Sequence, residues 1–283
     1  MLGLARFAMK SPLNVGVLAA GFAALPLLYA ISAALVGLVT LRRGTTAGTQ
    51  TLVWSLAGAL IAWRTTGIIL PLLVLPITAI LAIVLRRVQD WHLTLLFAAV
   101  LGLALAVFGQ LTMADRFAAV VTQIQTVMLG SESQPGWKVL EGIKDQGAYL
   151  IMAAEVFEAL LCLMLARYWQ AGLYNPGGFG AEFRALRYSG RLLVGWVVFL
   201  ALTLVVKPAA TLLLLMPLIF AGVALVHGVV ARAKLGGQWL VAFYLGTVLF
   251  NQFFLPLLVL AAVTDGVFDY RAQLDRRSDR DDE

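Results

Sequence analysis

Residues 91–113, WHLTLLFAAVLGLALAVFGQLTM, decide the fold class of this chain. The stretch holds no Asp, Glu, Lys or Arg over 23 residues. At a rise of ~1.5 Å per residue, a helix of this length measures about 35 Å, which exceeds the roughly 30 Å hydrocarbon core of a bilayer. The stretch therefore predicts a transmembrane helix.

The composition of the whole chain agrees with that prediction. Hydrophobic residues make up 61% of the 283 residues and charged residues 13%, against roughly 45–50% and about 25% in soluble proteins. Eleven of the charged residues lie in Asp265–Glu283, so the remainder is more apolar still. Because so few charges cannot cover a soluble globule, the composition excludes a soluble enzyme. It predicts an all-α fold, a polytopic transmembrane helical bundle.

Further apolar runs lie between short basic segments, and together they predict eight or nine spans. Beside Trp91–Met113, the runs are Pro12–Leu41, Thr51–Trp63, Gly67–Leu85, Gly147–Ala166, Leu192–Val206, Ala209–Ala231 and Trp239–Thr264. The first run is too long for one straight span and has Pro26 near its middle. Because proline disrupts a helix, that run predicts either one kinked helix or a hairpin of two short helices.

The basic residues of the connections predict the orientation, since cytoplasmic loops are enriched in Lys and Arg. The set placed in the cytoplasm is Arg42/Arg43, Arg86/Arg87, the Arg167–Arg191 connection and Arg232/Lys234, which leaves Arg64, the 114–146 loop and Lys207 outside. A single crossing by Trp239–Thr264 would put the arginines of the tail outside as well, against the rule, so the side of the tail stays open. Residues 1–270 are predicted to form the transmembrane domain and 271–283 a disordered charged tail.

Two connections are long enough to have structure of their own. In the outer loop, 114–146, Phe117–Leu129 predicts a short interfacial helix and Gly130–Gly136 a flexible turn. In the cytoplasmic loop, 168–190, residues 175–180 predict a turn and residues 182–188 a surface helix. The residues of this loop that would bind a partner are Asn175, Pro176, Gly177, Gly178, Phe179, Gly180, Arg184 and Arg187.

The chain offers little for catalysis. It has two histidines, His92 and His227, and one cysteine, Cys162, and none of them belongs to a metal-binding or nucleophilic motif. We therefore expect no enzyme activity, no metal and no cofactor. The basic residues occur in twos and threes between apolar runs, a pattern that sets topology and gives no sign of nucleic-acid binding.

Intramembrane polar residues are the remaining functional candidates, because burying them in lipid is costly. Glu155 and Glu158 are three residues apart and therefore share one face of their predicted helix. They could bind a cation or a basic substrate group, or carry a proton. The alternative is a pair near the outer interface, bonded to Arg64 or Lys207.

A second polar pair, Asn251 and Gln252, interrupts the last apolar run beside three phenylalanines. Adjacent amides and aromatic rings could line a ligand pocket, or the amides could bond neighbouring helices. Small residues form a stripe on the first run, at Ala19, Ala20, Ala23, Ala24, Ala30, Ala33 and Ala34. Such a stripe favours close helix packing, either within the chain or against another membrane subunit.

Several short motifs carry a family resemblance. The ending Gly266-Val267-Phe268-Asp269-Tyr270-Arg271, the pair His227-Gly228, the segment Leu41-Arg42-Arg43-Gly44 followed by Gly48, and the stretch Asn175–Arg187 resemble the YybS-like membrane proteins, a family defined as a domain of unknown function. That family is distantly similar to the substrate-binding subunits of energy-coupling-factor transporters, which dock on a shared ATP-driven module through alanine-rich faces. This chain departs from them in its number of spans and its long outer loop.

The resemblance implies a multi-pass protein of the bacterial inner membrane. Together with the polar residues, it leads to the hypothesis of a transport-related subunit that binds a small ligand through Glu155, Glu158, Asn251 and Gln252. Such a subunit has no ATPase of its own, so its partners would be the lipid bilayer and another membrane subunit or energising module. The alternative hypothesis is a membrane scaffold or assembly factor that acts through the 168–190 loop.

Overall fold

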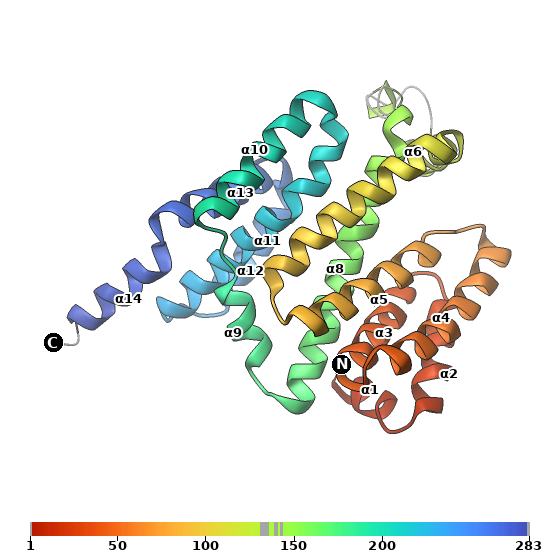
Figure 1. Ribbon diagram of the computed structural model, residues 1–283, viewed down its shortest axis with the longest axis horizontal. Coiled ribbons are helices and arrows are strands. Elements are labelled where there is room, and N and C mark those ends of the chain that lie inside the picture. The colour runs from red at the N-terminus through yellow and green to blue at the C-terminus, as the bar shows by residue number, and fades with distance from the viewer. Residues whose placement is uncertain (1, 131–135, 139–140, 142–143, 282–283) are drawn as a thin grey trace. The chain divides into compact units, whose positions relative to one another are not determined.

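The computed structural model describes residues 2–130, 136–138, 141 and 144–281. Within these ranges the chain is 88% helix and has no strand, which confirms the all-α prediction. The chain divides into two compact units (Figure 1). The first consists of Met1–Pro176 and Lys207–Leu213, and the second of Gly177–Val206 and Leu214–Glu283. The sequence predicts a single domain over residues 1–270, whereas the contacts within the chain separate these two bodies.

The first unit is built around helix α3. Its elements are α1 (Leu2–Ala8), α2 (Pro12–Ala23), α3 (Tyr29–Arg43), α4 (Thr45–Thr66), α5 (Pro71–Val88), α6 (Trp91–Leu129), the short 3-10 helix η1 (Lys144–Gln146) and α8 (Gly147–Tyr174). Helices α2, α4, α5 and α8 all pack against α3, and every residue from Ser32 to Leu41 is buried. Because α3 is covered on all sides, it can be apolar around its whole circumference.

The first apolar run is a hairpin of two helices. Helix α2 ends at Ala23 and α3 begins at Tyr29, with Pro26 in the connection. The Ser32 hydroxyl donates a hydrogen bond of 2.7 Å to the Ala19 carbonyl, a contact that a continuous helix could not make across 13 residues. Ala19, Ala23, Ala33 and Ala34 are fully buried, so these members of the small-residue stripe pack within the chain.

Helix α6 is longer than the span expected from its sequence. Asp90 caps its start, since Oδ1 accepts hydrogen bonds from the backbone N–H groups of His92 and Leu93. The predicted interfacial helix Phe117–Leu129 is helical, but it continues α6 beyond a break at Met113, where φ is −140° and ψ is 27°. Most of the predicted turn Gly130–Gly136 lies outside the described residues.

The second unit contains α9 (Gly178–Ala185), α10 (Gly190–Val206), most of α11 (Pro208–Arg232), α12 (Gln238–Leu249), α13 (Asn251–Phe268) and α14 (Tyr270–Asp281). The prediction of one helix over Trp239–Thr264 is wrong, because α12 and α13 meet at Phe250 and fold back on each other. The rings of Phe243 and Phe254 lie 6.4 Å apart, whereas a straight helix would separate these residues by about 16 Å. Gly246 permits this close approach, since a Cβ there would lie 2.7 Å from the Phe254 ring.

The reversal at Phe250 returns the chain to the end of the unit at which α11 finishes. Helix α12 follows Arg232 after a short connection, and Arg232 pairs with Asp275 of α14. Both ends of the α12–α13 hairpin therefore lie beside the same end of α11. The tail therefore lies at the same end of the second unit as Arg232.

The tail was predicted to be disordered from Arg271 onward, whereas the structure has helix α14 from Tyr270 to Asp281. Two contacts hold its first turns: Arg271 bonds to Asp265 of α13, and Asp275 bonds to Arg232 of α11. Composition alone misses this helix because these partners lie on other elements.

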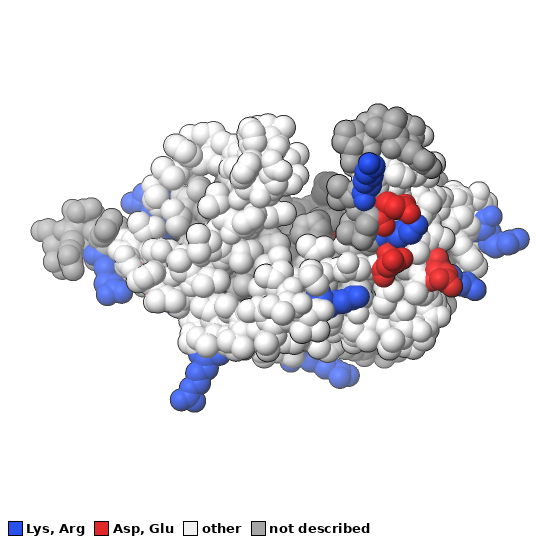
Figure 2. Space-filling model, turned by 90° about the horizontal axis from the view of Figure 1, so that it is seen from above, with Lys and Arg blue, Asp and Glu red and all other residues white. Residues whose placement is uncertain are grey.

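Several long apolar helices indicate a membrane protein. Five helices, Pro71–Val88, Trp91–Leu129, Lys144–Tyr174, Pro208–Arg232 and Asn251–Phe268, are long and apolar enough to cross a bilayer, and α9 with α10 adds a sixth if that bent pair counts as one span. Large apolar side chains stand exposed along α10, among them Val205 at 83%. In the view of Figure 2, charged side chains occupy small parts of the surface and most of it is uncharged.

Candidate functional site

The acidic pair lies on α8 in the first unit. Glu155 and Glu158 come from successive turns of α8, as their spacing predicts, and Glu158 lies near the middle of this 28-residue helix. Glu155 is only 2% exposed. Glu158 is partly buried and its Oε2 accepts a hydrogen bond of 3.1 Å from the Tyr29 hydroxyl. Tyr29 begins α3, so the hairpin at Pro26 delivers the hydroxyl to α8.

The two carboxylates differ in their partners. The Oε2 atom of Glu155 is buried and has no hydrogen-bond partner among the described residues. No ion pair joins either carboxylate to Arg64 or Lys207, the partners of the alternative interpretation. The Lys207 ammonium instead lies 5.2 Å from the centre of the Tyr149 ring. The pair is therefore an acidic site that no basic side chain neutralises within the described part of the first unit.

Asn251 and Gln252 lie in the second unit, at the tip of the α12–α13 hairpin, and both are exposed. Helix α13 begins at Asn251 without a side-chain cap, and the N–H groups of Phe253 and Phe254 donate to the Phe250 carbonyl. The four residues predicted to share one ligand site thus belong to two different units.

The predicted partner-binding loop is also divided. Asn175 and Pro176 close the first unit and are exposed, as is Gly177, where φ is 85°. Gly178, Phe179, Gly180 and Arg184 belong to α9, the predicted surface helix. Arg187 follows α9 and forms ion pairs with residues of the second unit.

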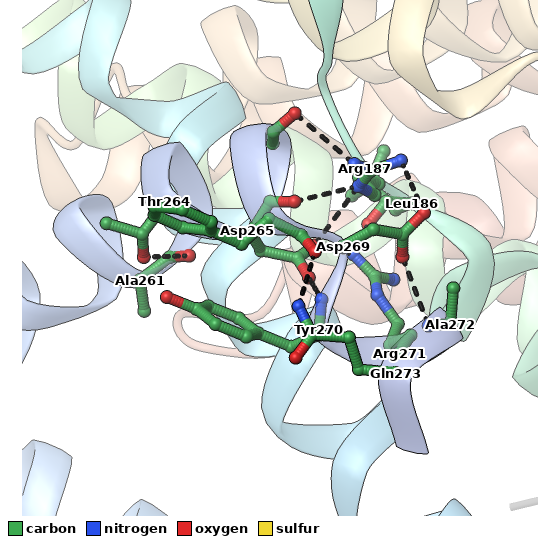
Figure 3. Close-up of polar contacts among 12 residues, drawn as sticks. Leu186, Arg187, Ala261, Thr264, Asp265, Asp269, Tyr270, Arg271, Ala272 and Gln273 are labelled. Carbon is green, nitrogen blue, oxygen red and sulfur yellow. Dashed lines mark hydrogen bonds and ion pairs between the residues drawn. The ribbon is translucent and has the colours of Figure 1, made fainter. Parts of the chain in front are cut away.

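Arg187 is part of an ion-pair network that closes the second unit (Figure 3). Its Nη1 lies 3.0 Å from Asp269 Oδ2, and its Nε donates to the Asp265 carbonyl at 2.9 Å. Arg271 Nη2 lies 2.6 Å from Asp265 Oδ2, and both side chains are almost fully buried. Arg271 also donates to the carbonyls of Arg184 and Leu186.

This network ties the segment after α9 to the α13–α14 junction. Two guanidinium groups face two carboxylates, and they also donate to carbonyls of the chain itself, whereas the buried Nε of Arg271 has no hydrogen-bond partner among the described residues. Most of its donors are used within the chain, so the network serves to fix the backbone. The role of Arg187 in this network could not be predicted from the sequence, since it lies 78 residues before Asp265.

No known protein family, characterised protein or solved structure matches this chain. Within the described ranges, no group of three or more His, Cys, Asp and Glu side chains is arranged to hold a metal ion.

Proposed function

We propose that this chain is a transport-related, multi-pass protein of the bacterial inner membrane that binds a small cationic ligand at Glu155, Glu158 and Tyr29. The observation that carries the proposal is the Glu155 carboxyl, which is buried in an apolar bundle with one oxygen unpartnered. An ionised carboxylate in such surroundings needs a neutralising partner. A cation, a basic substrate group or a proton would supply it.

The neighbours of Glu155 suit that role. Glu158 adds a second carboxyl one turn away, and Tyr29 holds Glu158 in place through its hydroxyl. One carboxyl oriented by a hydrogen bond beside one that lacks a partner forms a site that is already positioned before the ligand arrives. The chain shows no nucleotide-binding motif, so an energising module would have to be a separate subunit.

The finer predictions remain part of this proposal. Of the eight or nine predicted membrane crossings, we retain those outside the α12–α13 hairpin. We also retain the kinship with YybS-like proteins and a contribution of Asn251 and Gln252 to ligand binding at the hairpin tip. Their place at the start of an uncapped helix supports the last point, because broken helices at membrane depth present backbone groups to ligands in transporters.

The scaffold hypothesis has weaker support. Arg187, one of its proposed contact residues, spends its donors inside the chain. Asn175, Pro176 and Gly177 are exposed but form a short turn without an anchoring side chain, and Phe179 and Arg184 on α9 are only partly exposed.

The test is cation binding by the purified full-length chain in nanodiscs. Sodium, potassium and a series of organic amines would be titrated while the thermal midpoint is followed. We expect at least one cation to raise the midpoint, and Glu155→Gln and Glu158→Gln to abolish that increase. Asp115→Asn is the matched control, because it makes the same change in an exposed side chain of α6.

The result that would overturn the proposal is equally specific. If Glu155→Gln changes the midpoint without ligand but leaves every titration as in the parent chain, the acidic pair has only a structural role.

A further inference from the structure

A groove opens on the second unit between the end of α11, helix α9 and helix α14. It has a volume of about 390 Å³ and is lined by Ala181, Arg184, Ala185, Ala231, Arg232 and Asp275. Three of these residues are alanines, and the polar side chains are two arginines and one aspartate. This volume lies within the range of small-molecule sites, roughly 300–1,000 Å³.

The charges in the groove are not balanced. Arg232 has an internal partner, because its Nε lies 2.9 and 3.1 Å from the two carboxylate oxygens of Asp275. No ion pair joins the Arg184 guanidinium to any described carboxylate. The groove therefore carries one positive charge more than it neutralises, and its chemistry suits an anion that can face two guanidinium groups, such as a phosphate.

The backbone beneath Arg184 is held in place. Arg271, itself paired with buried Asp265, donates through Nη1 to the Arg184 carbonyl and through Nη2 to the Leu186 carbonyl. The ion-pair network thus fixes the end of α9, and with it the position from which the Arg184 side chain starts. A binding group that stands on a fixed backbone loses less entropy when a ligand arrives.

The place of the groove relative to α10 indicates the source of the phosphate. Helix α9 is inclined by 70° to α10, so if α10 crosses the bilayer, α9 lies close to the membrane plane. The rings of Phe179 and Phe183 stack on α9, 5.9 Å apart, and the Phe183 ring also packs edge-on against His227 of α11. The groove then lies at the depth of the lipid headgroups, on the side where basic residues are concentrated.

We propose that this groove binds the phosphate of an anionic phospholipid between Arg184 and Arg232, and that Asp275 occupies the same position when no lipid is bound. The carboxylate of Asp275 is the internal competitor: a lipid phosphate replaces it on Arg232 and engages Arg184 as well. Basic pockets between membrane helices bind lipid headgroups in this way. Lipid binding releases α14 from α11, while the Asp265–Arg271 pair keeps the first turn of α14 attached to α13.

The experiment compares lipids on the full-length chain in detergent micelles. Phosphatidylglycerol, phosphatidylcholine and inorganic phosphate are added in separate titrations, and bound lipid is counted by native mass spectrometry. We expect phosphatidylglycerol to bind in preference to phosphatidylcholine. Arg184→Gln should weaken that binding about fivefold, as expected for one arginine at a membrane surface, and Asp275→Asn should strengthen it by a similar factor.

Arg191→Gln is the matched control, since Arg191 is an exposed arginine of the same unit outside the groove. An equal loss in Arg191→Gln would show unspecific attraction and overturn the proposal. Binding of inorganic phosphate as tight as that of phosphatidylglycerol would assign the groove to a free anion and overturn the lipid assignment. Arg232→Gln removes a partner of Asp275 and could impair folding, so Arg184→Gln and Asp275→Asn decide the outcome.

Discussion

Glu155 and Asp265 are the two most buried acidic residues described, at 2% and 1% exposed, and they differ in what surrounds their carboxylates. Asp265 faces Arg271 at 2.6 Å and accepts the backbone N–H of Tyr270. Glu155 has another carboxylate as its charged neighbour and an unpartnered oxygen. A fully paired carboxylate stabilises the native chain. A buried carboxylate without a partner lowers the stability of the fold, so its presence points to a function. Glu155 is therefore the residue to which we assign the function.

The paired carboxylate leads to a stability prediction. Asp265→Asn keeps the shape of the side chain but leaves the buried Arg271 guanidinium without its counter-charge. Removing one partner of a buried pair costs about 3–5 kcal/mol, and we expect a loss of this size in the free energy of unfolding. The measurement is unfolding of the full-length chain in mixed micelles by a denaturing detergent.

Asp275→Asn is the control for that prediction. Its partner Arg232 is 32% exposed and Asp275 itself 56%, and exposed pairs contribute only about 0–1 kcal/mol. Similar losses in both variants would show that the Asp265–Arg271 pair is no stronger than a surface contact. The double variant Asp265→Asn with Arg271→Gln should lose less than the two single changes together, because the unpaired charge is gone.

Local spacing predicted some of these contacts and not others. Glu155 and Glu158 share a face because three residues make nearly one helical turn. Tyr29 lies 129 positions from Glu158, and no pattern in one sequence reports a contact made through a chain reversal. For the same reason, the sequence did not predict that Arg187 pairs with Asp265 and Asp269.

Among the elements, the chain reversal at Pro26 could be predicted from the sequence as one of two alternatives, whereas the reversal at Phe250 could not. Proline marked the first as a helix break, so a hairpin was one of two expected outcomes. The second has no proline at the turn itself, and an apolar run that turns back has the same hydropathy as one that continues. Helix packing therefore decided the topology where composition could not.

Glycines at helix crossings show which packing contacts are essential. A Cβ at Gly58 of α4 would collide with the backbone carbonyl of Ala20 on α2, whereas a Cβ at Gly21 of α2 would meet nothing within 4 Å. We expect Gly58→Ala to destabilise the first unit by about 1–3 kcal/mol, the usual cost of overpacking. Gly21→Ala should be neutral or slightly stabilising, since alanine is the better helix former.

Thermal midpoints of the two glycine variants in the same detergent would check this prediction. Equal midpoints would mean that α2 and α4 are not closely packed in the folded chain. Because both substitutions add one methyl group to neighbouring helices, their difference isolates the contact between α2 and α4 from the general effect of the substitution.

For the molecule as a whole, the structure shows at which end of the second unit the tail lies. Helix α14 bonds to Arg232 at the end of α11, and Arg271 bonds to the carbonyls of Arg184 and Leu186. The tail therefore lies at the same end of the second unit as α9. With α12 only 12 residues, or about 18 Å long, the α12 arm of the hairpin is too short to cross a bilayer.

This arrangement predicts the labelling pattern of single cysteines. In a Cys162→Ala background, Ala181→Cys in α9 and Gln273→Cys in α14 should react with an impermeant maleimide from the same side of sealed membrane vesicles. Val205→Cys, at the far end of α10, should react only from the opposite side. A continuous span over Trp239–Thr264 would instead separate Gln273→Cys from Ala181→Cys. Labelling of these two sites from opposite sides would therefore refute the α12–α13 reversal, and with it the internal competition between Asp275 and lipid phosphate at Arg232.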